Sequence, residues 1–306
     1  MANEVYVSNH ASLVDSEVFI PELEFLLAKR PFMRDLCVFK GDVKDSGGTT
    51  LSQPQIKLND VAESVAEGSA ISANTAITDG AYTLAPGRLA IKRVLSDLMH
   101  IIAANGMLNP QQFALWNHIA IMLGFDGLVA AALANFTGTV GTSGSGLTLL
   151  QFQAGYQTLL TRDAAGQMDR VISVLHPKQL NDLKQDLLNY NAVALDRQDV
   201  KDLVQMRGKS YQGTLDGVEI WVSTQVIDAN SAADHNGAMF IHGGLGYGQG
   251  GAKDGEYGRM LHDDTVVYTT FKNNGDKAET EIVTNGFYAV SVTEAAKGIK
   301  VITNHI

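Results

Sequence analysis

The sequence has 306 residues, 45% hydrophobic and 18% charged, so it can bury a core as one large domain or two medium ones. Twenty-three Lys and Arg against 33 Asp and Glu leave a formal charge of -10, which argues against a surface dedicated to nucleic-acid phosphates. A single cysteine, Cys37, excludes an intrachain disulfide and a thiolate-clamped zinc site, and it fits assembly in a reducing cytoplasm. No secretory signal is visible over Met1–His10.

The N-terminal segment predicts a short amphipathic helix that begins at Pro21 and ends before Pro31. Three leucines share one face of this helix: Leu23, Leu26 and Leu27. Because a helix this short must bury that face somewhere, we expect an N-terminal arm that lies on the body of the chain or on a neighbouring subunit.

A long two-stranded hairpin is predicted between Gly41 and about Arg88. The alternation over Gln55–Asn59 has the period of a strand, and Thr75–Val94 predicts a return strand after the polar stretch Asp60–Asn74. An isolated hairpin is marginally stable in water, so one of this length is expected to lie against another chain.

A long helix is predicted over Asn109–Phe136, about 35 to 40 Å in length. Its apolar window, His118–Phe136, is nearly long enough to span a membrane. The carboxylate of Asp126 at its centre, the flanking glycines and the lack of Lys or Arg at either end favour a soluble helix instead. The following segment, Gly138–Gly146, predicts a flexible link between two subdomains.

The second half of the chain mixes helices and strands without strict alternation, so the fold class is α+β and a doubly wound parallel sheet is not supported. Helices are predicted over Thr148–Asp163 and Pro177–Tyr190. Strands are predicted over Val171–Leu175, Val218–Val226, Ala238–His242, Thr265–Phe271, Glu281–Val292 and Ile299–Thr303.

Two glycine-rich segments resemble nucleotide-binding loops. Gly208–Ser210 matches the end of a phosphate-binding loop, but Leu203 stands where the first glycine is required and a strand follows instead of a helix. The dinucleotide spacing occurs at Gly246, Gly248 and Gly251. No helix can start after these glycines to hold a pyrophosphate, so Gly243–Gly258 is interpreted as a mobile surface loop.

Three further groupings are candidates for chemistry: Ser143 with Ser145, His242 and His262 with Asp263 and Asp264, and Glu279 with Glu281. The serine pair lacks the second glycine of a nucleophile elbow. Solvated turns explain the histidines and aspartates as well as a metal does. The glutamates alternate on one strand face, which is typical of a solvated or subunit-facing edge. We therefore predict no enzyme and no catalytic, cofactor-binding or metal-binding residues.

The order of parts (acidic arm, long hairpin, long helix, link and mixed α+β region) resembles the major capsid proteins of tailed phages, which have the HK97 fold. The similarity covers essentially the whole chain. Three segments carry it: AEGSAISANTAITDGAYTLAPGRLAIKRVLSDL (Ala66–Leu98), VISVLHPKQLNDLKQDL (Val171–Leu187) and YQGTLDGVEIWVSTQVI (Tyr211–Ile227).

The resemblance implies a division of the chain into the parts of that fold. These are an N-arm over 1–40, an extended E-loop over 41–88, a peripheral domain with its spine helix over 89–146, an axial domain over 147–261, returning peripheral strands over 262–294 and a closing axial strand over 295–306. Arm and hairpin expose faces that a lone subunit cannot bury, whereas neighbours in a closed shell can bury them.

The resemblance also implies function and partners. We expect pentamers and hexamers of this chain in an icosahedral shell around packaged double-stranded DNA that is contacted non-specifically, with no membrane. A scaffolding protein, a portal and a decoration protein are the implied partners, in a virion assembled in the bacterial host cytoplasm. The alternatives are an encapsulin-like nanocompartment shell and a nucleotide-dependent enzyme built on Gly246 or Lys209.

Subunit contacts are expected at the arm, at Ile56 and Leu58 of the hairpin, and where basic residues meet acidic neighbours. The basic residues are Arg88, Lys92 and Arg93. Some relatives join subunits by a covalent Lys–Asn bond, and the positions that match by location are Lys57 and either Asn273 or Asn274.

Overall fold

The computed structural model describes residues 4–5, 31–43, 49–57, 67, 78–97, 110–162, 170–189, 210–230, 234–250, 259–262 and 267–304. The chain divides into two compact units that each combine distant segments. The first unit comprises Met1–Thr49, Ala85–Ala132 and Tyr247–Val290. The second unit comprises Thr50–Leu84, Leu133–Gly246 and Ser291–Ile306.

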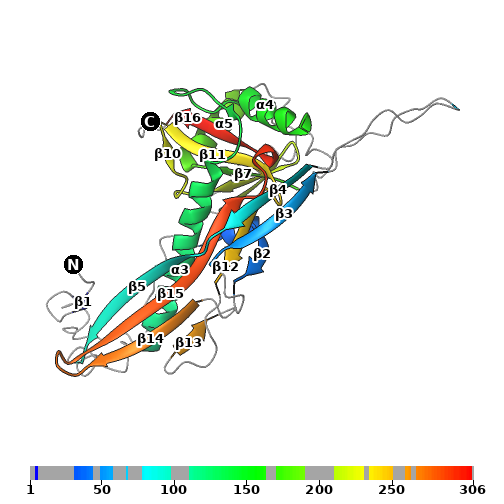
Figure 1. Cartoon of the computed structure of the whole chain (residues 1–306). Coiled ribbons are helices and arrows are strands. Elements are labelled where there is room, and N and C mark those ends of the chain that lie inside the picture. The colour runs from blue at the N-terminus through cyan, green and yellow to red at the C-terminus, as the bar shows by residue number, and fades with distance from the viewer. Residues whose placement is uncertain are drawn as a thin grey trace. The chain divides into compact units, whose positions relative to one another are not determined.

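A seven-stranded sheet organises the first unit (Figure 1). Its strands are β1 (Glu4–Val5), β2 (Val38–Asp42), β5 (Gly87–Ser96), β12 (Leu245–Gln249), β13 (Arg259–His262), β14 (Val267–Asn274) and β15 (Glu279–Val292). Their order is β1-β5-β15-β12-β2, and β14 pairs with both β13 and β15. The long strand β15 is therefore antiparallel to β5 on one side and to β14 on the other.

Helix α3 (Pro110–Leu133) belongs to the first unit for nearly its whole length. The ring of Phe125 meets those of Tyr247 and Tyr288 edge to face, with centroids 5.5 and 5.1 Å apart, which fixes the helix against strands β12 and β15. Gly286 of β15 lets the helix approach closely, because a Cβ there would lie 2.8 Å from a methyl carbon of Ile121.

A second seven-stranded sheet organises the other unit. Its strands are β6 (Thr139–Val140), β7 (Val171–Leu175), β8 (Tyr211–Leu215), β9 (Val218–Val222), β10 (Asp228–Ala229), β11 (Asp234–Ile241) and β16 (Gly298–Asn304). The order is β6-β16-β11-β7-β9-β8, with β10 beside β11. Two pairs are parallel, β7 with β9 and β6 with β16, and the remaining ladders given for this sheet are antiparallel.

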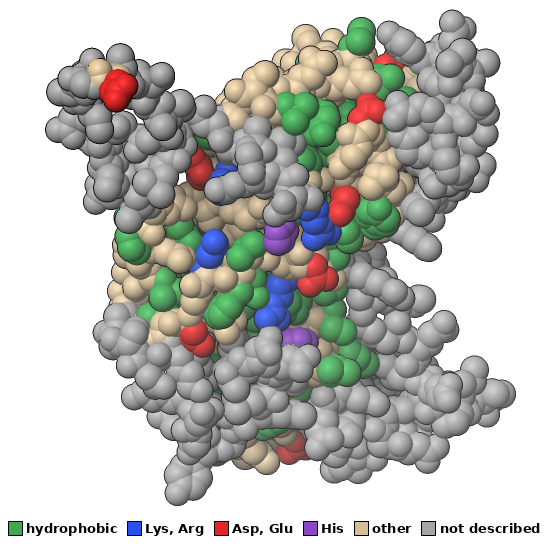
Figure 2. Space-filling view, turned by 90° about the vertical axis from the view of Figure 1, so that its right-hand side faces the viewer, with side chains coloured by type: hydrophobic (Ala, Val, Ile, Leu, Met, Phe, Trp, Pro, Cys, Tyr) green, Lys and Arg blue, Asp and Glu red, His purple; other side chains and the backbone are tan. Residues whose placement is uncertain are grey.

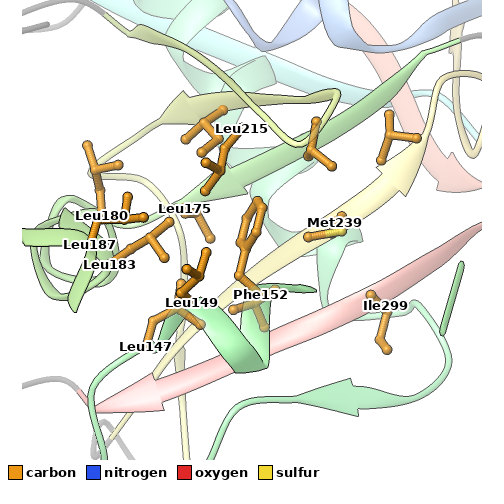
Figure 3. Packing of buried hydrophobic residues seen from close by; sticks show 14 of the residues in the cluster. Leu147, Leu149, Phe152, Leu175, Leu180, Leu183, Leu187, Leu215, Met239 and Ile299 are labelled. Atoms are coloured by element: carbon orange, nitrogen blue, oxygen red, sulfur yellow. The ribbon is translucent and has the colours of Figure 1, made fainter. Parts of the chain in front are cut away.

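Two helices, α4 (Leu149–Leu160) and α5 (Pro177–Asn189), enclose the core of this unit against its sheet. Figure 3 shows Leu180, Leu183 and Leu187 of α5 gathered beside Leu175 of β7. The helix starts follow from local chemistry. Thr148 and Gln151 form a reciprocal capping box for α4, and Pro177 occupies the first position of α5.

Strands β3 (Leu51–Lys57) and β4 (Thr78–Leu84) form a separate two-stranded sheet. They pair antiparallel in continuous register from Leu51 opposite Leu84 to Lys57 opposite Thr78. The predicted hairpin is therefore present. The predicted return strand is in fact two strands, because Ala85 and Pro86 separate β4 from β5 and the chain changes sheet there.

Most strands and helices predicted from periodicity are confirmed within a few residues, and two predictions are wrong in addition to that of a single return strand. The proposed flexible link over Gly138–Gly146 contains β6, which pairs with β16, and it is hydrogen-bonded to β11 through Asp234. The described part of the proposed mobile loop, residues 243–250, contains β12, a strand buried throughout between β15 and β2, whereas residues 251–258 lie outside the described residues. The arm helix between Pro21 and Arg30 lies outside the described residues.

Candidate functional site

The hairpin formed by β3 and β4 has one face made of small exposed side chains. Ser52 lies opposite Thr83 and Pro54 lies opposite Ala81, and all four residues are exposed. We call these four residues the hairpin face. Because Pro54 has no backbone N–H, the strand that carries it offers an incomplete edge to an additional strand.

The opposite face of the hairpin is anchored at its base. Leu84 is buried, and Tyr82 is 9% exposed and donates a hydrogen bond from its hydroxyl to Oε1 of Gln53, 2.6 Å away on the facing strand. Burial raises the pKa of Tyr82. The side chains of Ile56 and Lys57, and residue Leu58, lie outside what the structure describes, so their expected role in subunit contacts stays a prediction.

The three basic residues of β5 have partners in their own chain. Nζ of Lys92 lies 2.6 Å from Oε1 of Glu281, and this pair holds the pKa of the glutamate below its usual value. Nε of Arg88 donates to Asn285 and Nε of Arg93 donates to Asn117, each at 2.7 Å. The adjacent strand and helix α3 thus provide one acceptor for each cation, and their expected contacts with acidic neighbouring subunits stay a prediction.

Glu279 and Glu281 do not mark a sheet edge. Both lie on β15, which pairs with β5 and β14 on its two sides. Glu279 is buried and lies 3.8 Å from Nζ of Lys277, while Glu281 pairs with Lys92. The two carboxylates thus have structural partners, and the expected solvated or subunit-facing edge is wrong for this strand.

The carboxylate of Asp126 lies in the middle of α3 and is 2% exposed. Its two oxygens accept hydrogen bonds from the backbone N–H groups of Phe32 and Met33, each at 3.1 Å. These are the free donors of a short 3-10 helix, Met33–Leu36, so a side chain distant in sequence provides its N-terminal cap. Burial raises the pKa of Asp126 to about 6, and the two backbone hydrogen bonds oppose that rise.

Helix α3 has a segment, Phe113–Leu133, that is long and apolar enough to cross a membrane by length and composition. Half of that segment's most apolar window is buried inside the chain, and its central carboxylate caps the 3-10 helix. These contacts favour a core helix. The nearby Cys37 is buried, and burial raises the pKa of its thiol to about 12, so it is protonated at neutral pH.

The segment predicted as a link is fastened by Asp234, the first residue of β11. Its carboxylate accepts hydrogen bonds from Oγ of Ser143, from the backbone N–H of Gly144 and from the side chain of Asn230. These donors, the serine first, hold the pKa of Asp234 below its usual value. Ser143 is therefore a structural hydrogen-bond donor.

Within the described residues no group of three His, Cys, Asp or Glu side chains could hold a metal ion. His242 is exposed at the end of β11, whereas Asp263 and Asp264 lie outside the described residues. Gly246 and Gly248 are buried inside β12. That strand offers neither the turn nor the helix N-terminus that a dinucleotide requires. Ser210 leads directly into strand β8, which the sequence did not predict, and the predicted strand after it is β9.

Charged side chains of both signs occur among the described residues of the face in Figure 2. Lys and Arg lie there among Asp and Glu and do not form a continuous basic field. Together with the formal charge of -10, this distribution does not favour strong, phosphate-directed binding of nucleic acid.

Solved capsid structures resemble the chain over nearly its full length. A capsid chain of Ralstonia phage GP4 has a TM-score of 0.68 at 9% identity, covering 95% of each chain. A chain of Mycobacterium phage Che8 has a TM-score of 0.66 at 14% identity, covering 94% of this chain and 96% of the other. A capsid chain of Cyanophage P-SCSP1u has a TM-score of 0.63 at 15% identity, covering 96% and 94%.

The chain has the HK97-like capsid fold. At least 94% of this chain is covered in all three matches, so both compact units contribute to the likeness. No protein-family model and no curated protein matches the sequence. The fold predicted from the order of the sequence segments is thereby confirmed.

The described polar clusters and the hairpin differ in what they can contact. The carboxylates of Asp126 and Asp234 bond groups of their own chain, whereas the exposed side chains of the hairpin face can contact a second chain, so the hairpin face is the better candidate site. Sequence reasoning identified the hairpin but missed the hairpin face. The signal was available in the small and polar residues that alternate with Gln53, Gln55 and Tyr82.

Proposed function

We propose that this chain is the major capsid protein of a tailed phage, which self-assembles into the icosahedral shell that encloses packaged double-stranded DNA. The observation that carries the proposal is the likeness of the chain to seven phage structures and to the capsid of an empty GTA particle, over at least 94% of this chain and at least 93% of each of the others. A shell function requires subunit contacts and needs no active site.

The parts of the capsid fold are assigned as the sequence indicates. Residues 1–40 form the N-arm, 41–88 the E-loop, 89–146 and 262–294 the peripheral domain, and 147–261 with 295–306 the axial domain. The hairpin face supports this assignment, because four small exposed side chains form a smooth surface for a neighbouring subunit. The arm would cover a further neighbour through its three leucines.

The partners follow from the proposed function. Copies of the chain form pentamers and hexamers, while a scaffolding protein, a portal and a decoration protein complete the particle. DNA is enclosed with little attraction, because the chain carries an excess of ten negative charges. Assembly takes place in the host cytoplasm, and the finished chain resides in the virion.

Electron microscopy of the purified chain, alone and with its scaffolding protein, tests this function. Closed shells built from hexamers and pentamers are the expected result. A chain that stays monomeric in both conditions, with its normal thermal unfolding transition, would contradict the proposal. Small uniform shells that contain a co-purified cargo enzyme would instead favour the nanocompartment alternative.

A substitution on the hairpin face tests the proposed contact directly. Ala81→Arg places a long cation among the four small residues, and it should leave the subunit folded because Ala81 is exposed. We expect shells to be lost while the thermal midpoint changes little. Ala154→Arg, at an exposed position of α4, is the matched control for the effect of an added arginine.

A covalent bond between subunits is proposed separately. Lys57 is the last residue of β3, and Asn273 and Asn274 are the last two residues of β14, so each group ends a strand. An amide bond between Nζ of the lysine and Cγ of an asparagine would release ammonia. Mature particles should then show ladders on a denaturing gel that disappear in Lys57→Arg, and a gel with monomer alone would rule out the bond.

A further inference from the structure

Asparagine followed by glycine occurs four times in the sequence. The described residues contain three of these pairs: Asn236–Gly237, Asn274–Gly275 and Asn285–Gly286. A glycine after asparagine leaves the asparagine Cγ open to attack by the following backbone nitrogen, because no Cβ shields it and the backbone turns freely. The three pairs differ in what the fold requires of the glycine.

Packing requires the glycine in two of the pairs. A Cβ on Gly237 would lie 2.7 Å from Oε1 of Gln179 and 2.7 Å from the carbonyl oxygen of Val174. A Cβ on Gly286 would lie 2.8 Å from a methyl carbon of Ile121. Asn236 and Asn285 are also buried, at 6% and 4% exposure, and each lies within a strand.

The glycine of the third pair has no such packing role. A Cβ on Gly275 would meet nothing within 4 Å, and Gly275 is not among the glycines with positive φ. Gly275 begins the exposed turn between β14 and β15, which continues through Asp276 and Ala278. The two backbone hydrogen bonds of this turn are accepted by the carbonyl oxygens of Asn274 and Gly275 and donated by residues 277 and 278.

We propose that Asn274 is a site of spontaneous deamidation, with Gly275 supplying the nucleophile and water the second reactant. The backbone nitrogen of Gly275 loses its proton and bonds to Cγ of Asn274, and the side-chain amide leaves as ammonia. Water then opens the cyclic imide at either carbonyl, which yields aspartate or isoaspartate without any change in oxidation state.

The product differs from the original turn in charge and in length. Either product adds a negative charge two residues from Asp276, and isoaspartate also adds one methylene to the backbone path. The turn can accept both changes, because its four residues 275–278 are exposed. The modification therefore accumulates with age while the sheet that carries it stays intact.

Incubation of the folded chain in heavy-oxygen water, followed by peptide mass spectrometry, tests the proposal. Heavy oxygen should accumulate at Asn274, several-fold faster than at Asn236 and Asn285 and faster at higher pH, because the attacking nitrogen must lose a proton. Changes that arise later, during digestion in ordinary water, carry no heavy oxygen. Equal labelling of the three asparagines in the folded chain would overturn the proposal.

Gly275→Ala is the decisive variant because the structure has room for the added methyl group. Labelling at position 274 should fall several-fold while the thermal midpoint stays within error of the parent chain. Unchanged labelling in this variant would also overturn the proposal. In urea, Asn236 and Asn285 should incorporate heavy oxygen as well, because unfolding removes the protection that the fold gives them. If they stay unlabelled in urea, the fold is not what protects them, and this result contradicts the structural argument for Asn274.

Discussion

Asp126 on helix α3 accepts a hydrogen bond from the backbone N–H of Met33, 3.1 Å away. The pKa of this carboxyl rises from 3.8 to about 6 on folding, so the folded chain binds a proton more tightly than the unfolded chain. The contribution of Asp126 to stability is therefore most favourable below pH 3.8 and is lost as the pH rises through about 6.

The measurable consequence is a pH-dependent difference between the parent chain and Asp126→Asn. Relative to this variant, the parent should lose about 2 kcal/mol of unfolding free energy between pH 4 and pH 7. Urea denaturation of the unassembled chain at a series of pH values measures this. A difference that stays constant over the whole range would contradict the prediction.

Lys92 and Glu281 join β5 to β15 by an ion pair whose side chains are 47% and 17% exposed. Because solvent screens a pair this exposed, Lys92→Glu and Glu281→Lys should each lower the thermal midpoint only slightly. The double variant restores opposite charges and should recover part of the loss. Thermal unfolding of the four chains forms the cycle, and strictly additive losses would exclude the coupling.

Gly298, the first residue of β16, faces the ring of Phe136, and a Cβ there would lie 2.3 Å from a ring carbon. That ring is buried and stacked on Phe240, so it has little room to move. Gly298→Ala should therefore cost about 1 to 3 kcal/mol. Adding Phe136→Leu should recover part of this loss, whereas Gly275→Ala, in open space, is the neutral control.

His176 precedes Pro177 and acts as the N-cap of α5. Its ring Nδ1 accepts a hydrogen bond from the backbone N–H of Lys178, while the backbone N–H of His176 donates to Oε1 of Gln179. Both variants lose the stacking of the His176 ring on His235, whose centroids lie 3.5 Å apart, but His176→Asn keeps a capping acceptor and should therefore be about 1 kcal/mol more stable than His176→Ala. Chemical denaturation of both variants decides this, and equal losses would remove the capping role.

The sequence predicts those helices and strands whose position depends only on neighbouring residues. The leucine spacing after Pro177 and the capping residues Thr148 and Gln151 predict α5 and α4, because a helix repeats every 3.6 residues and its start needs a cap. The short apolar run Val171–Leu175 predicts a buried strand, which is β7. The order of these elements was enough to identify the capsid fold.

The errors arose where a distant residue decides the structure. Gly246 and Gly248 suggest a mobile loop, but they lie in a strand packed between β15 and β2. The Gly- and Ser-rich segment at Ser143 resembles a linker until Asp234 accepts its hydrogen bonds. In the hairpin, the sequence predicts that side chains alternate between the two faces of the β3–β4 sheet. It does not indicate which of these faces is anchored by Leu84.

Arg162, just after α4, donates hydrogen bonds to the carbonyl oxygens of three residues: Thr137, Ala296 and Gly298. All three acceptors are peptide groups, which keep their electron pairs at any pH that a folded chain survives. Acid that neutralises the glutamate partners of Lys92 and Arg170 leaves these three hydrogen bonds of Arg162 intact. As the pH falls, the ion pairs of the two sheets should therefore be lost before the hydrogen bonds of Arg162 to the residues around β6 and β16.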